Sequence, residues 1–134
     1  MGKTRARSST AGITLDSGAL IAPDRGDGRM IALLNRALAQ RCSFRIPAGV
    51  VGQAWRDGRT QVTLARFLRA REVQIVPLDE SLSRSCGELC GAAGTSDVVD
   101  ASVVILAKAH HDLIVTSDYD DLRRLDPRRQ IIKI

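Results

Sequence analysis

The chain has 134 residues, 44% of them hydrophobic, which is enough for one hydrophobic core but not comfortably for two. No apolar run approaches the twenty residues of a membrane span, and no apolar stretch follows the N-terminal charges as it would in a secretory signal. The net charge of +5 suits a polyanionic partner but is common in ordinary proteins. We therefore expect one cytoplasmic, non-membrane domain at residues 11–134, after a basic, flexible tail at residues 1–10.

Apolar runs typical of strands alternate along the chain with segments whose apolar residues recur at helical spacing. In chain order, the expected elements are a strand at 12–16, a helix at 30–41, a strand at 44–47, helices at 48–58 and 61–72, a strand at 73–78, helices at 80–93 and 98–111, a strand at 112–118, a helix at 120–125 and a strand at 130–134. This alternation predicts an α/β fold with a parallel sheet covered by helices on both faces.

Polar residues and glycines mark the expected ends of these elements. Ser17 and Gly18 predict a turn after the first strand, and Gly94 is expected to end the helix at 80–93. The expected N-caps of the last three long helices are Thr60, Asp79 and either Ser96 or Asp97.

The three cysteines, Cys42, Cys86 and Cys90, support neither a disulfide framework nor a zinc site. Their number is odd, and no histidine stands at ligand spacing from them. We expect them to be buried or idle thiols.

Acidic residues are unevenly distributed. The segment from Asp97 to Asp121 contains six aspartates and one Lys, a local balance of −5, which leaves +10 for the rest of the chain. An acidic pocket within a basic protein is the arrangement expected if divalent cations hold a phosphodiester.

Four aspartates, three of them from this segment, are expected at one edge of the sheet. Asp16 and Asp118 each end a strand, and parallel strands end at the same edge. Asp97 and Asp100 share one face in the first turn of the helix at 98–111. A cation would relieve the repulsion among them, and oxygen ligands without His or Cys favour Mg²⁺ or Mn²⁺. Such an ion lowers the pKa of a bound water to give an attacking hydroxide, as in nucleases.

The sequence resembles PIN-domain ribonucleases, and in particular the VapC-type toxins of type II toxin–antitoxin pairs, from about residue 13 to residue 134. The resemblance rests on ITLDSGALIA, IPAGVVGQAWRDG with the following LARFLR, VQIVPLDE, TSDVVDASVVILA and LIVTSDYDDLRRL. It implies a three-layer α/β/α fold with a central, mainly parallel sheet and a Mg²⁺ or Mn²⁺ site of three or four acids. It also implies cleavage of RNA, a cognate antitoxin and a homodimer.

Within the resemblance, Asp16, Asp100 and Asp118 match the family's acids and are the expected catalytic residues and metal ligands. Asp97 lies one turn earlier than Asp100 on the same face, and is expected as a further metal ligand or as an N-cap, or as both. Gln53 stands where many PIN domains have Glu. Its amide can coordinate through the carbonyl oxygen but brings no charge, which leaves open whether the site holds one ion or two.

Four further side chains are candidates for outer roles. Asp121 is expected as a cap of the helix at 120–125 or as an outer ligand of the metal, and Gln53 as another outer ligand. Arg56 and Arg59 are candidates for RNA contact, although residues of this kind are usually just solvated.

The leading hypothesis is a metal-dependent endoribonuclease that acts as a toxin. The alternative is an RNA- or partner-binding protein on a PIN scaffold, with the amide of Gln53 marking weakened or lost nuclease activity. A phosphohydrolase of the haloacid dehalogenase type fits poorly, because LDSGA lacks a second aspartate two residues after the first.

Overall fold

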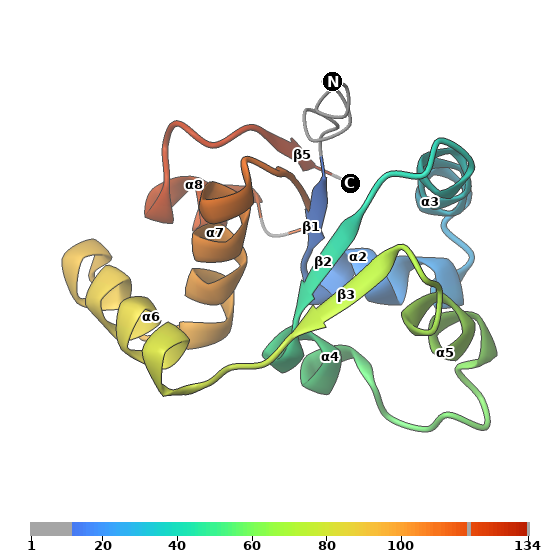
Figure 1. Ribbon diagram of the computed structural model, residues 1–134, viewed down its shortest axis with the longest axis horizontal. Helices are drawn as coiled ribbons and strands as arrows, with labels where there is room; N and C mark the ends of the chain where they lie inside the picture. Colours follow the sequence, from blue (N-terminus) through green and yellow to red (C-terminus); the bar gives the residue numbers. More distant parts are fainter. Residues whose placement is uncertain (1–11, 118, 134) are drawn as a thin grey trace, which may run out of the picture.

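The computed structural model describes residues 12–117 and 119–133. The tail expected at residues 1–10 and the side chain of Asp118 lie outside these ranges. Five parallel strands form one sheet in the order β3–β2–β1–β4–β5 (Figure 1). The strands are β1 Ile13–Leu15, β2 Phe44–Pro47, β3 Val73–Val76, β4 Leu113–Thr116 and β5 Ile131–Lys133. The parallel sheet that the alternation of elements predicted is therefore confirmed.

Helices cover both faces of the sheet, so the three-layer α/β/α architecture is also confirmed. In Figure 1, α6, α7 and α8 lie on one side of the strands, and α2, α3 and α5 lie on the other. The described residues form the short 3-10 helix η1 Ala22–Arg25 and the α-helices α2 Ser17–Ile21, α3 Gly28–Ala39, α4 Ala48–Ala54, α5 Val62–Leu68, α6 Glu80–Ala93, α7 Val98–His110 and α8 Tyr119–Leu125.

The centre of the core lies where α7 packs against β1, β2 and β4. Burying one large aliphatic side chain contributes roughly 1.5 to 3 kcal/mol, so this contact fixes the direction of α7 over the sheet. The buried residues of α7 are Asp100, Ala101, Ser102, Val103, Val104, Leu106 and Ala107. The fully buried residues of the strands include Leu15, Phe44, Ile46, Ile114 and Val115.

A second, smaller apolar cluster joins α6 to α7. It consists of Cys86 and Cys90, which lie one turn apart on α6, together with Ala101 of α7. Both thiols are free, and burial together with the nearby Cys90 raises the pKa of Cys86. Among the described helices, none alone is long and apolar enough to cross a membrane; only α6 and α7 taken together, with a bend of 106° between them, meet that length and composition.

The turn expected at Ser17 and Gly18 is wrong, because α2 begins there. Asp16 caps this helix by accepting a hydrogen bond from the Ala19 amide at 3.0 Å. Gly18 lets α2 start beside the end of β4, since a Cβ at this position would lie 1.8 Å from Ser117 Oγ. A tertiary contact therefore overrides the turn preference of the Ser-Gly pair.

The helix expected at residues 48–58 ends early, at Ala54. The side chain of Gln61 folds back to replace the missing helical bonds. Its Nε2 donates to the Ala54 carbonyl at 2.8 Å, and its Oε1 accepts from the amides of Arg56 at 2.7 Å and Asp57 at 3.0 Å. One amide side chain thus satisfies three backbone groups and forms the turn before α5.

Two of the expected N-caps are confirmed. Asp79 accepts from the Leu82 amide at 2.8 Å, and Asp97 accepts from the Asp100 amide at 3.0 Å. Thr60 is not a cap, because its hydroxyl donates to the Asp57 carbonyl at 3.1 Å and α5 begins only at Val62. The expected end of α6 at Gly94, in a left-handed conformation with φ 75°, is confirmed.

Candidate metal and phosphodiester site

Asp16 lies at the carboxyl end of β1, where two neighbouring elements hold its carboxylate. Its Oδ1 accepts from the Ala19 amide at 3.0 Å, and its Oδ2 accepts from the hydroxyl of Thr116, the last residue of β4. The residue is only 2% exposed. Because β1 and β4 are adjacent parallel strands, this hydrogen bond joins their ends at one edge of the sheet.

Asp97 and Asp100 lie at the start of α7, at the same lower edge of the sheet in Figure 1 where β1 ends. Asp97 is exposed and accepts from the Asp100 amide at 3.0 Å, so its role as an N-cap is confirmed. Asp100 is 9% exposed. The helix dipole favours carboxylates at this end of α7, by roughly 0.3 to 1 kcal/mol each at the surface.

A pocket of about 90 Å³ lies between the start of α7 and helix α8. The structure brings together three carboxylates there, those of Asp97, Asp100 and Asp121. The pocket is lined by Thr95, Asp97, Asp100, Asp121, Arg124 and Leu125. Asp121, in the first turn of α8, also borders a second pocket of about 220 Å³. That pocket is lined by Ser117, Tyr119, Asp120, Asp121 and Lys133.

Within residues 12–117 and 119–133, no three His, Cys, Asp or Glu side chains form a group that could hold a metal ion. Asp118, one of the four predicted ligands, lies outside those residues. The donors that the structure does place at this edge are carboxylate oxygens, the type that Mg²⁺ and Mn²⁺ prefer. The donor chemistry therefore fits these ions, and the ligand set stays a prediction.

Known structures share this arrangement of elements. No family model matches the sequence, and no curated protein does. FitAcB from Neisseria gonorrhoeae is 18% identical, with a TM-score of 0.64 over 90% of this chain and 96% of that one. VapBC2 from Rickettsia felis, bound to a promoter DNA fragment, is 16% identical, with a TM-score of 0.66 over 91% of this chain and 98% of that one. Mycobacterium tuberculosis VapC20, a Sarcin-Ricin loop cleaving toxin, is 18% identical, with a TM-score of 0.61 over 82% of this chain and 94% of that one.

The chain has the fold of the VapC-type PIN domain. The fold expected from the sequence resemblance is thus confirmed. This likeness extends to the fold alone, so the role of each side chain must come from the geometry of this chain.

Gln53, the residue that stands where many PIN domains have Glu, is exposed on α4. One turn earlier on the same face, Gly49 approaches the start of α7 so closely that a Cβ there would lie 3.0 Å from Val99 Cγ2. The face of α4 that bears Gln53 is therefore turned towards the first turn of α7. A role for Gln53 as an outer ligand stays a prediction.

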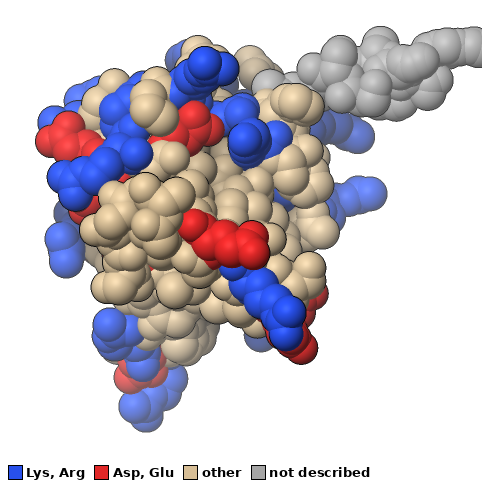
Figure 2. Space-filling view, turned by 90° about the vertical axis from the view of Figure 1, so that its left-hand side faces the viewer, with Lys and Arg blue, Asp and Glu red and all other residues tan. Residues whose placement is uncertain are grey.

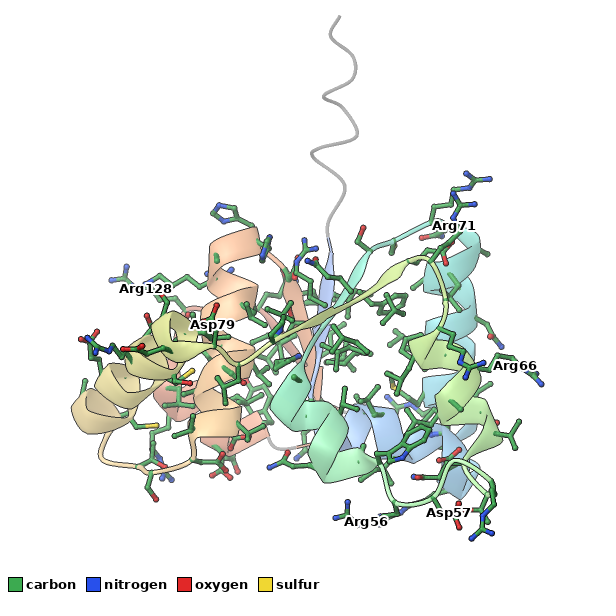
Figure 3. All side chains as sticks on the ribbon, turned by 60° about the horizontal axis from the view of Figure 1, so that its bottom comes forward. Arg56, Asp57, Arg66, Arg71, Asp79 and Arg128 are labelled. Atoms are coloured by element: carbon green, nitrogen blue, oxygen red, sulfur yellow. The ribbon has the colours of Figure 1, made fainter. Side chains whose placement is uncertain are left out.

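The guanidinium groups of Arg56 and Arg59, both candidates for RNA contact, are engaged within the chain. Arg56 Nη1 donates to the carbonyls of Gly52 at 3.1 Å and Trp55 at 2.6 Å. Arg59 donates to the Asp57 carboxylate at 3.2 Å from both Nε and Nη2, and these bonds hold the pKa of Asp57 below its usual value. Figure 3 shows Arg56 and Asp57 in the loop between α4 and α5.

Asp112, one of the six acids in the aspartate-rich segment, does not lie near the pocket. It precedes β4 at the opposite edge of the sheet and is 2% exposed. Arg45 Nε lies 2.9 Å from its Oδ2, Arg45 Nη2 donates to Oδ1 at 3.1 Å, and Thr14 Oγ1 donates to Oδ2 at 2.8 Å. The position of Asp112 could have been predicted from the sequence, because a residue that begins a strand lies at the opposite edge of a parallel sheet from a residue that ends a strand.

On the face of the molecule shown in Figure 2, basic side chains are spread out rather than gathered at one point. On the side of the molecule where α6 lies, Lys and Arg side chains occupy much of the margin, and a large part of the centre is uncharged (Figure 2).

Proposed function

We propose that this chain is a Mg²⁺- or Mn²⁺-dependent endoribonuclease and the toxin of a type II toxin–antitoxin pair. The observation that carries the proposal is the pocket lined by Asp97, Asp100 and Asp121, at the same edge of the sheet as the buried Asp16. The fold adds support, since VapC20 is a toxin that cleaves the Sarcin-Ricin loop.

The size of the pocket favours a polymer backbone over a small molecule. Sites that enclose a small-molecule ligand usually measure about 300 to 1,000 Å³. The acidic pocket measures about 90 Å³, which suits water, an ion and the oxygens of a phosphate, and it shares Asp121 with the neighbouring pocket of about 220 Å³. A substrate whose reacting group projects from a long chain, such as RNA, suits this shape.

Under this proposal, Asp16, Asp97, Asp100 and Asp118 hold the divalent ion. When bound, such an ion polarises a phosphoryl oxygen and lowers the pKa of a coordinated water. The contribution of the chain is to hold these carboxylates in fixed positions. Thr116 and the Ala19 amide fix the Asp16 carboxylate, and the buried face of α7 fixes the backbone of Asp100. Carboxylates held in this way need little reorganisation when charge develops on the phosphate.

We further propose that the chain binds a cognate antitoxin, because the neighbours FitAcB and VapBC2 are complexes with an antitoxin. An apolar groove of about 260 Å³ between α3 and α5 is the surface that we assign to it. The groove is lined by Pro23, Ile31, Leu34, Asn35, Leu38, Thr63, Arg66, Phe67 and Ala70. Figure 3 shows Arg66 and Arg71 projecting outwards on this side, so an acidic, amphipathic segment is the expected occupant. The homodimer stays a prediction.

The proposal is tested by comparing Asp100→Asn with Asp79→Asn. Both variants replace one carboxylate by an amide, but Asp79 caps α6 outside the pocket and Asn is an equally good cap. We expect Asp100→Asn to lower Mn²⁺-dependent RNA cleavage by about a thousandfold or more, equivalent to several kcal/mol of lost electrostatic stabilisation. Asp79→Asn should cleave like the unaltered chain. Full activity in Asp100→Asn contradicts the proposal.

Calorimetry with Mn²⁺ distinguishes the enzyme from a binding protein on the same fold. The unaltered chain should bind Mn²⁺, and Asp100→Asn should bind it more weakly. A folded chain that takes up no Mn²⁺ and cuts no RNA supports the binding protein instead.

A further inference from the structure

Arg124 is the one basic residue among those that line the acidic pocket. It lies on α8, whose Leu122 and Leu125 are 0% and 8% exposed and anchor the helix to the core. Arg124 itself is exposed. The buried leucines therefore hold the backbone of Arg124 at the wall of the pocket while its guanidinium group stays accessible.

The preceding residue, Arg123, shows what a structural arginine does in the same helix. Its Nη1 donates to the carbonyls of Pro127 at 2.5 Å and Arg129 at 2.9 Å, and its Nη2 donates to the Tyr119 hydroxyl at 3.0 Å. The guanidinium carbon also lies 5.0 Å from the centre of the Tyr119 ring. Arg123 thus closes the turn between α8 and β5, and both of its terminal nitrogens donate within the chain.

Arg124, by contrast, has no ion pair and no side-chain hydrogen bond with any residue in the described ranges. Asp121 lies three residues earlier on α8, at a spacing that permits an ion pair, yet the two side chains do not pair. An accessible guanidinium group thus lines the same pocket as three carboxylates, and it donates to no side chain or carbonyl among residues 12–117 and 119–133.

We propose that Arg124 binds a phosphate of the RNA backbone at or next to the bond that is cut. The inference rests on the proposed function, because it uses the same pocket. A guanidinium group offers a planar pair of N–H donors that matches two phosphate oxygens, and such charge-assisted bonds are stronger than neutral ones. Arg56 and Arg59 are less suited to this role, since their guanidinium groups already donate within the chain.

The opposing possibility is that Arg124 serves only as a counter-ion for the pocket carboxylates. The two roles predict different results when the charge is removed. A counter-ion would compete with a divalent cation, so its loss would strengthen Mn²⁺ binding and leave RNA binding unchanged. A phosphate ligand would be needed for RNA binding itself.

The test compares Arg124→Ala with Arg128→Ala. Arg128 is also exposed, lacks a side-chain ion pair in the described ranges and does not line the acidic pocket, so both variants lose one positive charge but only one loses it at the pocket. The RNA probe is a fluorescein-labelled, single-stranded 12-mer of mixed sequence. Binding is measured by anisotropy with Ca²⁺ in place of Mg²⁺ at several salt concentrations, and gels confirm that the RNA stays intact.

We expect Arg124→Ala to bind this RNA on the order of tenfold more weakly, the effect of losing one charge-assisted contact. The slope of log affinity against log salt should fall by about 0.7, the value for one phosphate contact on a single strand. Arg128→Ala should change the affinity far less. Equal binding by the two variants overturns the inference, as does tighter Mn²⁺ binding by Arg124→Ala with unchanged RNA affinity. Because cleavage is not measured, this outcome is independent of whether the unaltered chain is a nuclease.

Discussion

The two edges of the sheet use the same residue type in opposite ways. At the amino edge, the buried carboxylate of Asp112 is neutralised within the chain by Arg45 and receives a hydrogen bond from Thr14. At the carboxyl edge, three aspartates line one pocket, and the arginine beside them remains unpaired with any described residue. A carboxylate that only stabilises the fold is paired within the fold. Carboxylates that gather at a pocket, beside an arginine that pairs with none of the described residues, indicate binding of something outside the chain.

The largest expected effect on stability lies at the amino edge. Asp112→Ala removes the partner of Arg45, whose side chain is only 16% exposed, and leaves that charge poorly solvated. We expect a loss of about 3 kcal/mol in the free energy of unfolding, as for other broken buried pairs. Urea denaturation measures it. A loss below about 1 kcal/mol would show that the Asp112–Arg45 pair stabilises the fold no more than a surface ion pair does. The distinction between the two edges would then be lost.

A smaller effect is expected from Gly18→Ala at the carboxyl edge. A Cβ there would lie 1.8 Å from Ser117 Oγ and 2.8 Å from Ser117 Cβ, so the end of β4 must move away from α2. Overpacking of this kind costs about 1 to 3 kcal/mol. The control is Gly28→Ala at the start of α3, where a Cβ meets nothing within 4 Å. Thermal unfolding should show Gly28→Ala unchanged or slightly more stable, and equal losses in the two variants would refute the steric argument.

The smallest effect separates the two roles of Asp97. Asp97→Ala removes the cap of α7 and should cost about 1 kcal/mol, whereas Asp97→Asn keeps the cap and should cost only a few tenths. Both variants lose the carboxylate. If Asp97 is a metal ligand, calorimetry will show weaker Mn²⁺ binding in both; if it is only a cap, Asp97→Asn will bind Mn²⁺ like the unaltered chain.

The strands and long helices could be predicted because their signals are local. Apolar spacing, and caps such as Asp79 and Asp97, depend only on residues close in sequence, and the alternation of elements then implies a parallel sheet. The start of α2 carried such a signal too, since Asp16 is a good N-cap residue, but the Ser-Gly pair after it is more typical of a turn.

The remaining features depend on contacts between distant residues. The early end of α4 depends on Gln61, which satisfies its last carbonyl from seven residues away. The meeting of Asp121 and Arg124 with Asp100 depends on how α8 docks beside α7, which the burial of Leu122 and Leu125 determines. Apolar spacing shows that one face of α8 is buried. It does not show which helix will lie against the charged face of α8.

The cluster of Cys86, Cys90 and Ala101 has a kinetic consequence for the outer helix. Because the buried residues of α6, Cys86 and Cys90, belong to a cluster separate from the main core, α6 should detach more readily than the central helix unfolds. Its two thiols are buried in the closed state, and burial raises the pKa of Cys86, so alkylation is slow until α6 opens. The rate at which Cys86 and Cys90 are labelled therefore measures how often α6 opens while the sheet stays intact.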